Sequence, residues 1–205
     1  MPPVSEGDDM LTGERLARLQ QLWEDNEAHD RHAAARAEKR LTITPQTGRF
    51  LYQLSRTRRA RITLEIGTSS GYSTLWLALA AQAHKGQVVS VDHSAHKIAL
   101  AHANLQAFAL EPVVTLHTDD AFAVLANTAD ESVDLLFLDA DRQRYPGYWP
   151  EITRILAPGA LLVMDNALSH VEECAPFVQA VLATRGYLAE TYPIGKGQFV
   201  ILKDL

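Results

Sequence analysis

The chain has 205 residues, of which 47% are hydrophobic, and a formal net charge of −6. This length suits one sizeable domain, and the hydrophobic content excludes disorder for most of the chain. The acidic balance argues against a nucleic-acid partner, which requires a basic surface. The single cysteine, Cys174, excludes an internal disulfide framework and favours a reducing compartment.

The start of the chain shows no targeting or anchoring pattern. Residues 1–10 are acidic and lack an apolar stretch, so we expect a disordered tail rather than a signal peptide. No run reaches the roughly 18 apolar residues that a membrane span needs. We therefore expect no membrane partner and a cytoplasmic location. Residues 11–205 are expected to form a single domain with an N-terminal helical extension over 11–55.

Helical periodicity marks this extension over residues 11–40. The apolar positions that fall near one face are Leu11, Leu16, Leu19, Leu22 and Trp23. We interpret the stripe as an ordinary amphipathic helix packing on its own domain, because every such helix needs one. A lid or a dimer-forming arm would carry the same stripe. A second, short helix is predicted over 47–55.

From residue 61 onward, predicted strands alternate with predicted helices. The strands are expected over 61–67, 87–92, 112–117, 133–139 and 160–165. The helices are expected over 71–83, 94–109, 120–127, 145–156 and 171–185. This alternation predicts parallel β-α-β units, and hence an α/β fold with a Rossmann-like, doubly wound, mostly parallel sheet.

The C-terminal part departs from this alternation. Pro158-Gly159 is expected to form the turn into the strand over 160–165. Two final strands, over 187–194 and 198–203, flank Gly195-Lys196-Gly197 and predict a hairpin, so the last strand should be antiparallel.

The most informative stretch is the joint between the first strand and its helix, which reads LEIGTSSGYS. Gly67 and Gly71 are spaced as G-x-x-x-G, and Glu65 stands just before the first glycine. A strand, a glycine loop and a helix in this order form the place where a nucleotide-like cofactor meets a doubly wound sheet. The acid and the lack of a following lysine disfavour a polyphosphate. The joint therefore suits a cofactor with a cationic part and a nucleoside part.

Acidic or amide side chains follow every predicted parallel strand, at the edge where ligands bind in such sheets. Asp92, about 20 residues past the glycines, is placed to bind ribose hydroxyls. The others are Asp119, Asp120, Asp139, Asp141, Asp165 and Asn166. Helix capping explains Asp119 or Asp120, but is a poor account of the last four together. Carboxylates and an amide that converge suit a hard cation such as Mg²⁺, Ca²⁺ or Mn²⁺.

With these motifs in place, the chain resembles the class I S-adenosylmethionine-dependent methyltransferases. The stretches LEIGTSSGYS, VVSVD, LLFLDADRQRY and LLVMDN are similar to motifs of the cation-dependent O-methyltransferases, the group of catechol and caffeoyl-CoA O-methyltransferases and their bacterial relatives. The resemblance covers roughly residues 41–203. The D-A-D pattern near the fourth strand, together with D-N after the fifth, is more specific than the glycine motif.

The resemblance implies a role for particular residues. Glu65, Gly67 and Ser73 would lie by the methionine part of S-adenosylmethionine, with Asp141 near the same end. Asp92 would bind the ribose. The adenine would lie beside Asp120 and Ala121, and the segment with Leu41 and Ile43 would close over the cofactor. The metal ligands would be Asp139, Asp165 and Asn166.

The implied reaction is in-line transfer of a methyl group from the sulfonium to an oxygen of a small-molecule hydroxyl acceptor. The metal, Mg²⁺ in the first instance, would hold two vicinal oxygens and acidify the attacking hydroxyl. The resemblance also suggests a homodimer.

One departure from the family concerns proton transfer. The family usually has a lysine directly after D-A-D as its proposed general base, and here the position is Arg142. Arginine stays protonated, so Arg142 could stabilise a developing oxyanion but could not take a proton. Either metal acidification suffices or His170 acts as base, although His170 could equally be a helix cap or a surface residue.

Two other functions compete with this one. A methyltransferase-fold protein that binds the cofactor with weak or no catalysis is suggested by Arg142. A dehydrogenase using a nicotinamide cofactor would need G-x-G-x-x-G and a catalytic pair, and neither is visible. A second departure is Ser169, where plant relatives have an aromatic side chain that packs on an aryl substrate, so specificity for aryl acceptors is not implied.

Overall fold

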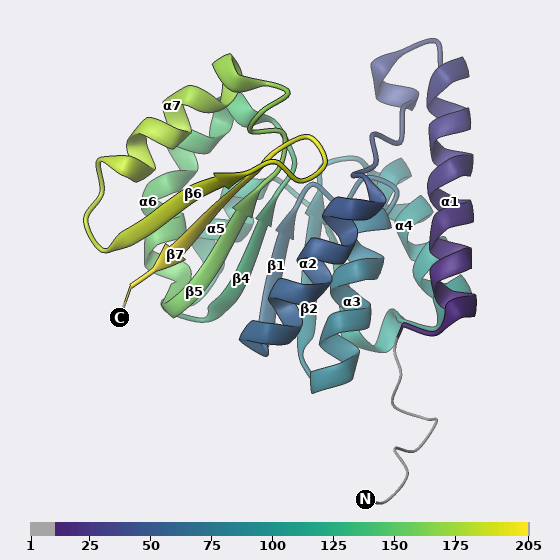
Figure 1. Ribbon diagram of the computed structural model, residues 1–205, viewed down its shortest axis with the longest axis horizontal. Helices are drawn as coiled ribbons and strands as arrows, with labels where there is room; N and C mark the ends of the chain where they lie inside the picture. The colour runs from purple at the N-terminus through teal and green to yellow at the C-terminus, as the bar shows by residue number, and fades with distance from the viewer. Residues whose placement is uncertain (1–10, 205) are drawn as a thin grey trace, which may run out of the picture.

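A computed structural model describes residues 11–204 and shows a seven-stranded sheet with helices on both faces (Figure 1). The predicted tail over 1–10 lies outside the described residues. The strands are β1 Ile62–Ile66, β2 Gln87–Asp92, β3 Val114–Thr118, β4 Val133–Leu138, β5 Leu156–Met164, β6 Tyr187–Tyr192 and β7 Gln198–Lys203. The main helices are α1 Gly13–His32, α2 Pro45–Arg58, α3 Tyr72–His84, α4 Ala95–Phe108, α5 Ala121–Asn127, α6 Tyr145–Ile155 and α7 Val171–Leu182.

The strand order is β3-β2-β1-β4-β5-β7-β6, which confirms the doubly wound, mostly parallel sheet. Strands β1 to β5 pair in parallel, and β7 pairs antiparallel with both β5 and β6. The order reverses at β1, which lies between β2 and β4. A crevice opens beyond the carboxyl ends of the strands at such a reversal, so the topology places a ligand site after β1 and β4.

Alternate residues of each central strand point into two separate cores. In β4, Leu136 and Leu138 pack with residues of α6 and α7, whereas Leu135 and Phe137 pack with residues of α2 and α3. Because both faces of the sheet are covered, the strands are continuous apolar runs. The two packed faces hold the strand ends rigidly, and the side chains that follow them inherit fixed positions.

The N-terminal extension differs from the prediction over 11–40. The helix α1 begins after the cap Thr12 and ends at His32, and a short 3₁₀ helix, Arg36–Glu38, follows. The carboxylate of Asp30 accepts hydrogen bonds from the backbone N–H groups of Arg40 and Leu41, which turns the chain back toward α1. The second helix is longer than predicted because Thr44 caps it and Pro45 occupies its first turn.

The predicted turn at Pro158-Gly159 is wrong, because these residues lie within β5. The strand already pairs with β4 at Leu156, and the register then shifts, so that Leu135 lies opposite Leu161. Gly159 has a φ of +71°, which lets the chain bulge there without breaking the strand. The hairpin of β6 and β7 is confirmed. In residues 11–204, no helix has the length and apolar character needed to cross a membrane.

Candidate functional site

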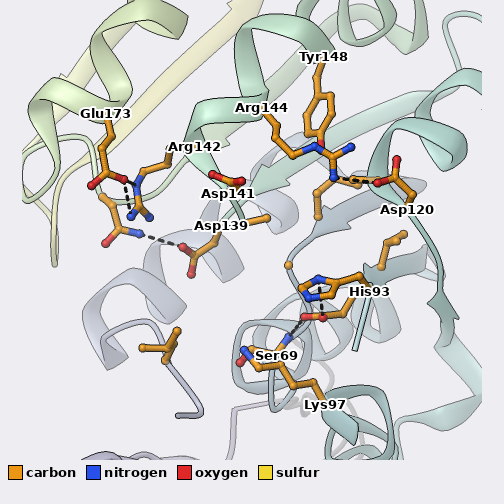
Figure 2. Close-up of a pocket in the computed structure, with 18 of the residues that line it drawn as sticks. Ser69, His93, Lys97, Asp120, Asp139, Asp141, Arg142, Arg144, Tyr148 and Glu173 are labelled. Carbon is orange, nitrogen blue, oxygen red and sulfur yellow. Dashed lines mark hydrogen bonds and ion pairs between the residues drawn. The ribbon is translucent and has the colours of Figure 1, made fainter. Parts of the chain in front are cut away.

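A cavity of about 440 Å³ lies at the reversal of strand order, beyond the carboxyl ends of β1, β2 and β4. Its wall is made largely of charged side chains, several of which Figure 2 shows converging from different elements. Of the residues predicted from the sequence, the cavity is lined by Leu41, Gly67, Asp92, Asp120, Ala121, Asp139, Asp141, Arg142, Asn166 and His170. The structure therefore brings most of the predicted set around one space.

The glycine loop forms the floor of this cavity. Gly67 has a φ of +108°, and a Cβ there would overlap the backbone carbonyl of Asp139. Glycine is thus required both by conformation and by the close approach of the segment after β4. Next to it, the backbone N–H of Ser69 donates to Asp92 Oδ2 at 2.9 Å. Asp92 is buried and lies where a ribose-binding acid is expected.

Glu65 lies behind the loop, fully buried, and does not line the cavity. The hydroxyls of Thr74 and Ser90 both donate to its Oε2, at 2.5 Å, while its Oε1 has no hydrogen-bond partner. Burial raises the pKa of Glu65 to about 7, against the hydroxyl contacts, which lower it. Ser73 and Ile43 are also buried and absent from the cavity wall.

Three side chains meet where β4 and β5 end. The Asn166 amide donates to Asp139 Oδ1 at 2.8 Å and to Asp165 Oδ2 at 3.2 Å, and the Gln198 amide donates to Asp165 Oδ1. Burial raises the pKa of both Asp139 and Asp165, and for Asp139 the nearby Asp165 raises it further. Two buried carboxylates side by side lack a full counter-charge, and a cation between them would relieve this.

The cluster combines two carboxylates with one amide. Among residues 11–204, no group of three or more His, Cys, Asp or Glu side chains is arranged to hold a metal ion. A cation would therefore depend on the Asn166 carbonyl oxygen as its third protein ligand, with the amide turned over from the orientation in which its NH₂ group donates to the two carboxylates. Asn166 has a φ of +69°, the left-handed region that asparagine tolerates better than most residues. This conformation turns its side chain toward the two aspartates.

Arg142 is buried and engaged by an acid. Its Nε and Nη2 both lie 2.9 Å from Glu173 Oε2, on α7 (Figure 2). Glu173 had not been singled out from the sequence, because an acid in the first turn of a helix has an ordinary role there. The pair fixes a permanent positive charge beside Asp139. This charge offsets part of the rise that burial causes in the pKa of the Asp139 carboxyl. Arg142 can complement negative charge here but cannot accept a proton.

His170 lies at the N-cap of α7, but its side chain makes no capping bond. Its Nδ1 instead lies 2.9 Å from the Ser169 hydroxyl, which lies 3.3 Å from Asn166 Oδ1. The other ring nitrogen has no hydrogen bond among the described residues, and the side chain lines the cavity. Helix capping by the side chain is therefore wrong, and the residue lies at the cavity wall, while its role stays a prediction.

The far end of the cavity carries a second charged pair. Arg144 Nη1 lies 2.8 Å from Asp120 Oδ2, and its guanidinium stacks 5.4 Å from the centre of the Tyr148 ring. Asp120 also caps α5 through the N–H groups of Phe122 and Ala123, as predicted for a strand-end acid. Tyr148 is buried and also lines the cavity.

Ser69, His93, Lys97 and Lys196 also line the cavity. They come from loops and helix starts, where such residues are normally solvated, so their residue types alone did not predict a place at the cavity. Lys196, at the tip of the β6–β7 hairpin, reaches the cavity because the hairpin folds back over the loop after β5. The N–H groups of Leu168 and Ser169 donate to its carbonyl.

Comparison with known proteins agrees with this geometry. Residues 9–182 match a family model described as O-methyltransferase. The chain is 31% identical over 131 residues to the catechol O-methyltransferase of Niastella koreensis, covering 62% of this chain and 59% of that protein. It is 34% identical over 129 residues to the catechol O-methyltransferase of Mycobacterium tuberculosis, covering 63% and 58%. The matches thus span a little under three fifths of each relative.

A solved structure extends the similarity to the whole fold. The O-methyltransferase of Bacillus cereus, in complex with SAH, superposes with a TM-score of 0.78 at 26% identity, covering 95% of this chain and 92% of that one.

Proposed function

The chain belongs to the O-methyltransferase family, and we propose that it transfers the methyl group of S-adenosylmethionine to a hydroxyl of a small molecule beside a bound divalent cation. One observation carries the proposal. Asp139 and Asn166 line the same cavity that the glycine loop opens, and Asp165, which does not line it, is hydrogen-bonded to Asn166. A methyl donor and an acidified acceptor oxygen would therefore share one space.

The cavity has the features that the cofactor requires. Its volume of about 440 Å³ is in the range of small-molecule sites. Gly67 allows close backbone approach, Asp92 offers carboxylate lone pairs to ribose hydroxyls, and Asp141 offers a negative charge near the predicted methionine end. The buried Glu65 adds negative potential behind the loop. These groups suit a ligand with both a nucleoside part and a positive charge.

The donor set after β4 and β5 fits a hard cation. All three ligands would be oxygens, which Mg²⁺, Ca²⁺ and Mn²⁺ prefer. Burial raises the pKa of Asp139 and of Asp165, and the nearby Asp165 raises that of Asp139 further. A divalent cation bound between them would stabilise the charged form of both carboxylates. Mg²⁺ is the first candidate. When bound, the cofactor supplies the methyl group and the cation acidifies the acceptor hydroxyl.

The chain's own residues would orient and protect the reaction. Asp139 and Asp165 come from adjacent strand ends, so their separation is fixed by the β4–β5 pairing. Arg142, held by Glu173, places a permanent positive charge where the acceptor oxygen becomes negative. The fixed geometry of these groups aligns the acceptor with the methyl donor, which is the larger share of such catalysis.

His170 is the group in this site that is suited to accept the acceptor's proton. Its Nδ1 lies 2.9 Å from the Ser169 hydroxyl, and the residue lines the cavity. A neutral imidazole can accept a proton, unlike the arginine at position 142. We assign it the role of general base, with Arg142 as the stabiliser of the developing charge.

Methyl transfer to catechol and to 3,4-dihydroxybenzoate tests the proposal, using labelled S-adenosylmethionine and mass spectrometry. Transfer should occur with Mg²⁺, stop in chelator and return when Mg²⁺ is added. Asp165→Asn should lose the dependence together with most activity, whereas Asp130→Asn, an exposed aspartate outside the site, should behave as the wild type.

The possible outcomes separate the candidate functions. Cofactor binding without transfer to any vicinal diol, with or without metal, would favour a protein that only holds the cofactor. Transfer that continues unchanged in chelator would overturn the role of the cation. A failure to bind S-adenosylmethionine would remove the proposed function altogether.

A further inference from the structure

We infer that Asp30, on α1, is a positioning residue for the cofactor, because it holds a wall of the cavity in place. That wall belongs to the segment over residues 33–44, which connects α1 to α2 and is here called the strap. The inference rests on the proposed function, since it takes the cofactor as the occupant of the cavity. It gives α1 a role beyond packing on α2 and α3.

The Asp30 carboxylate holds the strap through two hydrogen bonds. Its Oδ1 accepts from the Arg40 N–H at 2.7 Å, and its Oδ2 accepts from the Leu41 N–H at 2.8 Å. Two successive backbone N–H groups thus hold a single carboxylate, the arrangement by which a backbone binds an anion. Both bonds are charge-assisted, so they are stronger than ordinary backbone hydrogen bonds.

The hydrogen bond from the Leu41 N–H to Asp30 matters because the backbone conformation of Leu41 is strained. Its φ is +47°, in the left-handed region that disfavours residues with a Cβ. No hydrogen bond within a helix or strand fixes it there. The Leu41 side chain lines both the cofactor cavity and a neighbouring cavity of about 330 Å³. A strained residue at a cavity wall is held by its surroundings, and Asp30 is the part of those surroundings that bonds to its N–H.

A second set of contacts ties the strap to the glycine loop. The Arg40 guanidinium donates to Asn26 Oδ1 at 2.6 Å, and the Asn26 amide donates to the Ser70 hydroxyl at 3.3 Å. The Ser69 hydroxyl donates to the Arg40 carbonyl. Asn26 is fully buried, so these polar contacts have no water to replace them. Through Ser69, whose N–H binds Asp92, α1 is connected to the predicted ribose site.

Figure 1 shows the path of this connection: the chain leaves the end of α1, turns over in the strap and descends to α2 beside the carboxyl ends of the strands. Without Asp30, Leu41 would relax to an ordinary conformation and the strap would form the wall only part of the time. The apparent affinity for the cofactor falls in proportion to the fraction of molecules with the wall formed. The groups that act on the acceptor follow β4 and β5, so turnover at saturating cofactor should change far less.

The test compares Asp30→Ala with Asp25→Ala. Asp25 is on the same helix, is exposed and makes a hydrogen bond only to Gln21 among the described residues. Binding of S-adenosylhomocysteine is measured by calorimetry, and KM for S-adenosylmethionine and kcat are measured with a vicinal diol. We expect Asp30→Ala to raise the dissociation constant and KM about tenfold or more, with kcat within about threefold. Asp25→Ala should stay within about twofold of the wild type.

Equal binding by the wild type and Asp30→Ala, or equal losses in both variants, would overturn the inference. No binding by the wild type would instead refute the proposed function. A measurement on the unaltered protein covers the case in which Asp30→Ala fails to fold. Hydrogen exchange at the Arg40 and Leu41 amides should slow on addition of S-adenosylhomocysteine, while exchange in β6 stays constant. Unchanged exchange in the strap would contradict the inference without any substitution.

Discussion

Replacing Glu65 with glutamine should stabilise the cofactor-free protein at neutral and alkaline pH, but not in acid. Glu65 is fully buried behind the glycine loop, with two hydroxyls bonded to one oxygen and none to the other. Glutamine has nearly the same shape, and its carbonyl can accept both hydroxyl bonds. The substitution therefore removes the titration of the group while leaving its packing in place.

The size of the effect follows from the pKa. Burial raises the pKa of Glu65 from 4.5 to about 7. Between these values the folded state binds a proton that the unfolded state releases, so the free energy of unfolding falls as the pH rises and is constant outside that window. At about 1.4 kcal/mol per pKa unit, the full loss is about 3 kcal/mol, and most of it falls between pH 5 and pH 8.

Urea denaturation of wild type and Glu65→Gln at several pH values measures this difference directly. Titrating groups that do not interact with Glu65 cancel in the comparison, and Glu190→Gln, at an exposed position on β6, serves as the control. We expect the gain of Glu65→Gln over wild type to grow by about 2–3 kcal/mol from pH 5 to pH 8, while the gain of Glu190→Gln stays near zero. A difference for Glu65→Gln that does not depend on pH, or that shrinks as pH rises, would refute the reasoning.

One pair of substitutions and one single substitution test the site further. Gly67→Ala should destabilise the protein by about 2–4 kcal/mol, because its Cβ would overlap the Asp139 carbonyl at a positive φ. Gly147→Ala, in α6 where an added Cβ meets no atom within 4 Å, should stabilise it by about 0.5–1 kcal/mol. Urea denaturation measures both, and equal effects would contradict the argument. His170→Ala should lower kcat about 100-fold, and an unchanged rate would remove the imidazole from the mechanism.

The sheet and the strand-end acids could be predicted from the sequence because both follow from repeated local patterns. Apolar runs separated by helical segments specify parallel β-α-β units, and adjacent parallel strands must bring their carboxyl ends together. Asp139, Asp165 and Asn166 therefore met as expected. Their roles toward a cation, and the role of Ser73 and Ile43 toward the cofactor, stay predictions.

Other features depended on contacts between distant segments, which no local pattern carries. The end of α1 at His32 is set by the bonds from Asp30 to the strap, and the burial of Arg142 is set by Glu173, 31 positions away on α7. Pro158 and Gly159 form a turn signal by composition, yet the pairing of β5 with β4 keeps them within a strand. The homodimer suggested by the resemblance also stays a prediction.

Electron paramagnetic resonance of Mn²⁺ tests the central claim most directly, because it reports the ion at the cluster itself. The protein with S-adenosylhomocysteine and a vicinal diol should bind a single Mn²⁺ per chain. Added Mg²⁺ should displace this ion, and Asp165→Asn should lose it while Asp130→Asn keeps it. The account would be contradicted if no Mn²⁺ bound under these conditions while the same preparation methylated the diol in the presence of a chelator.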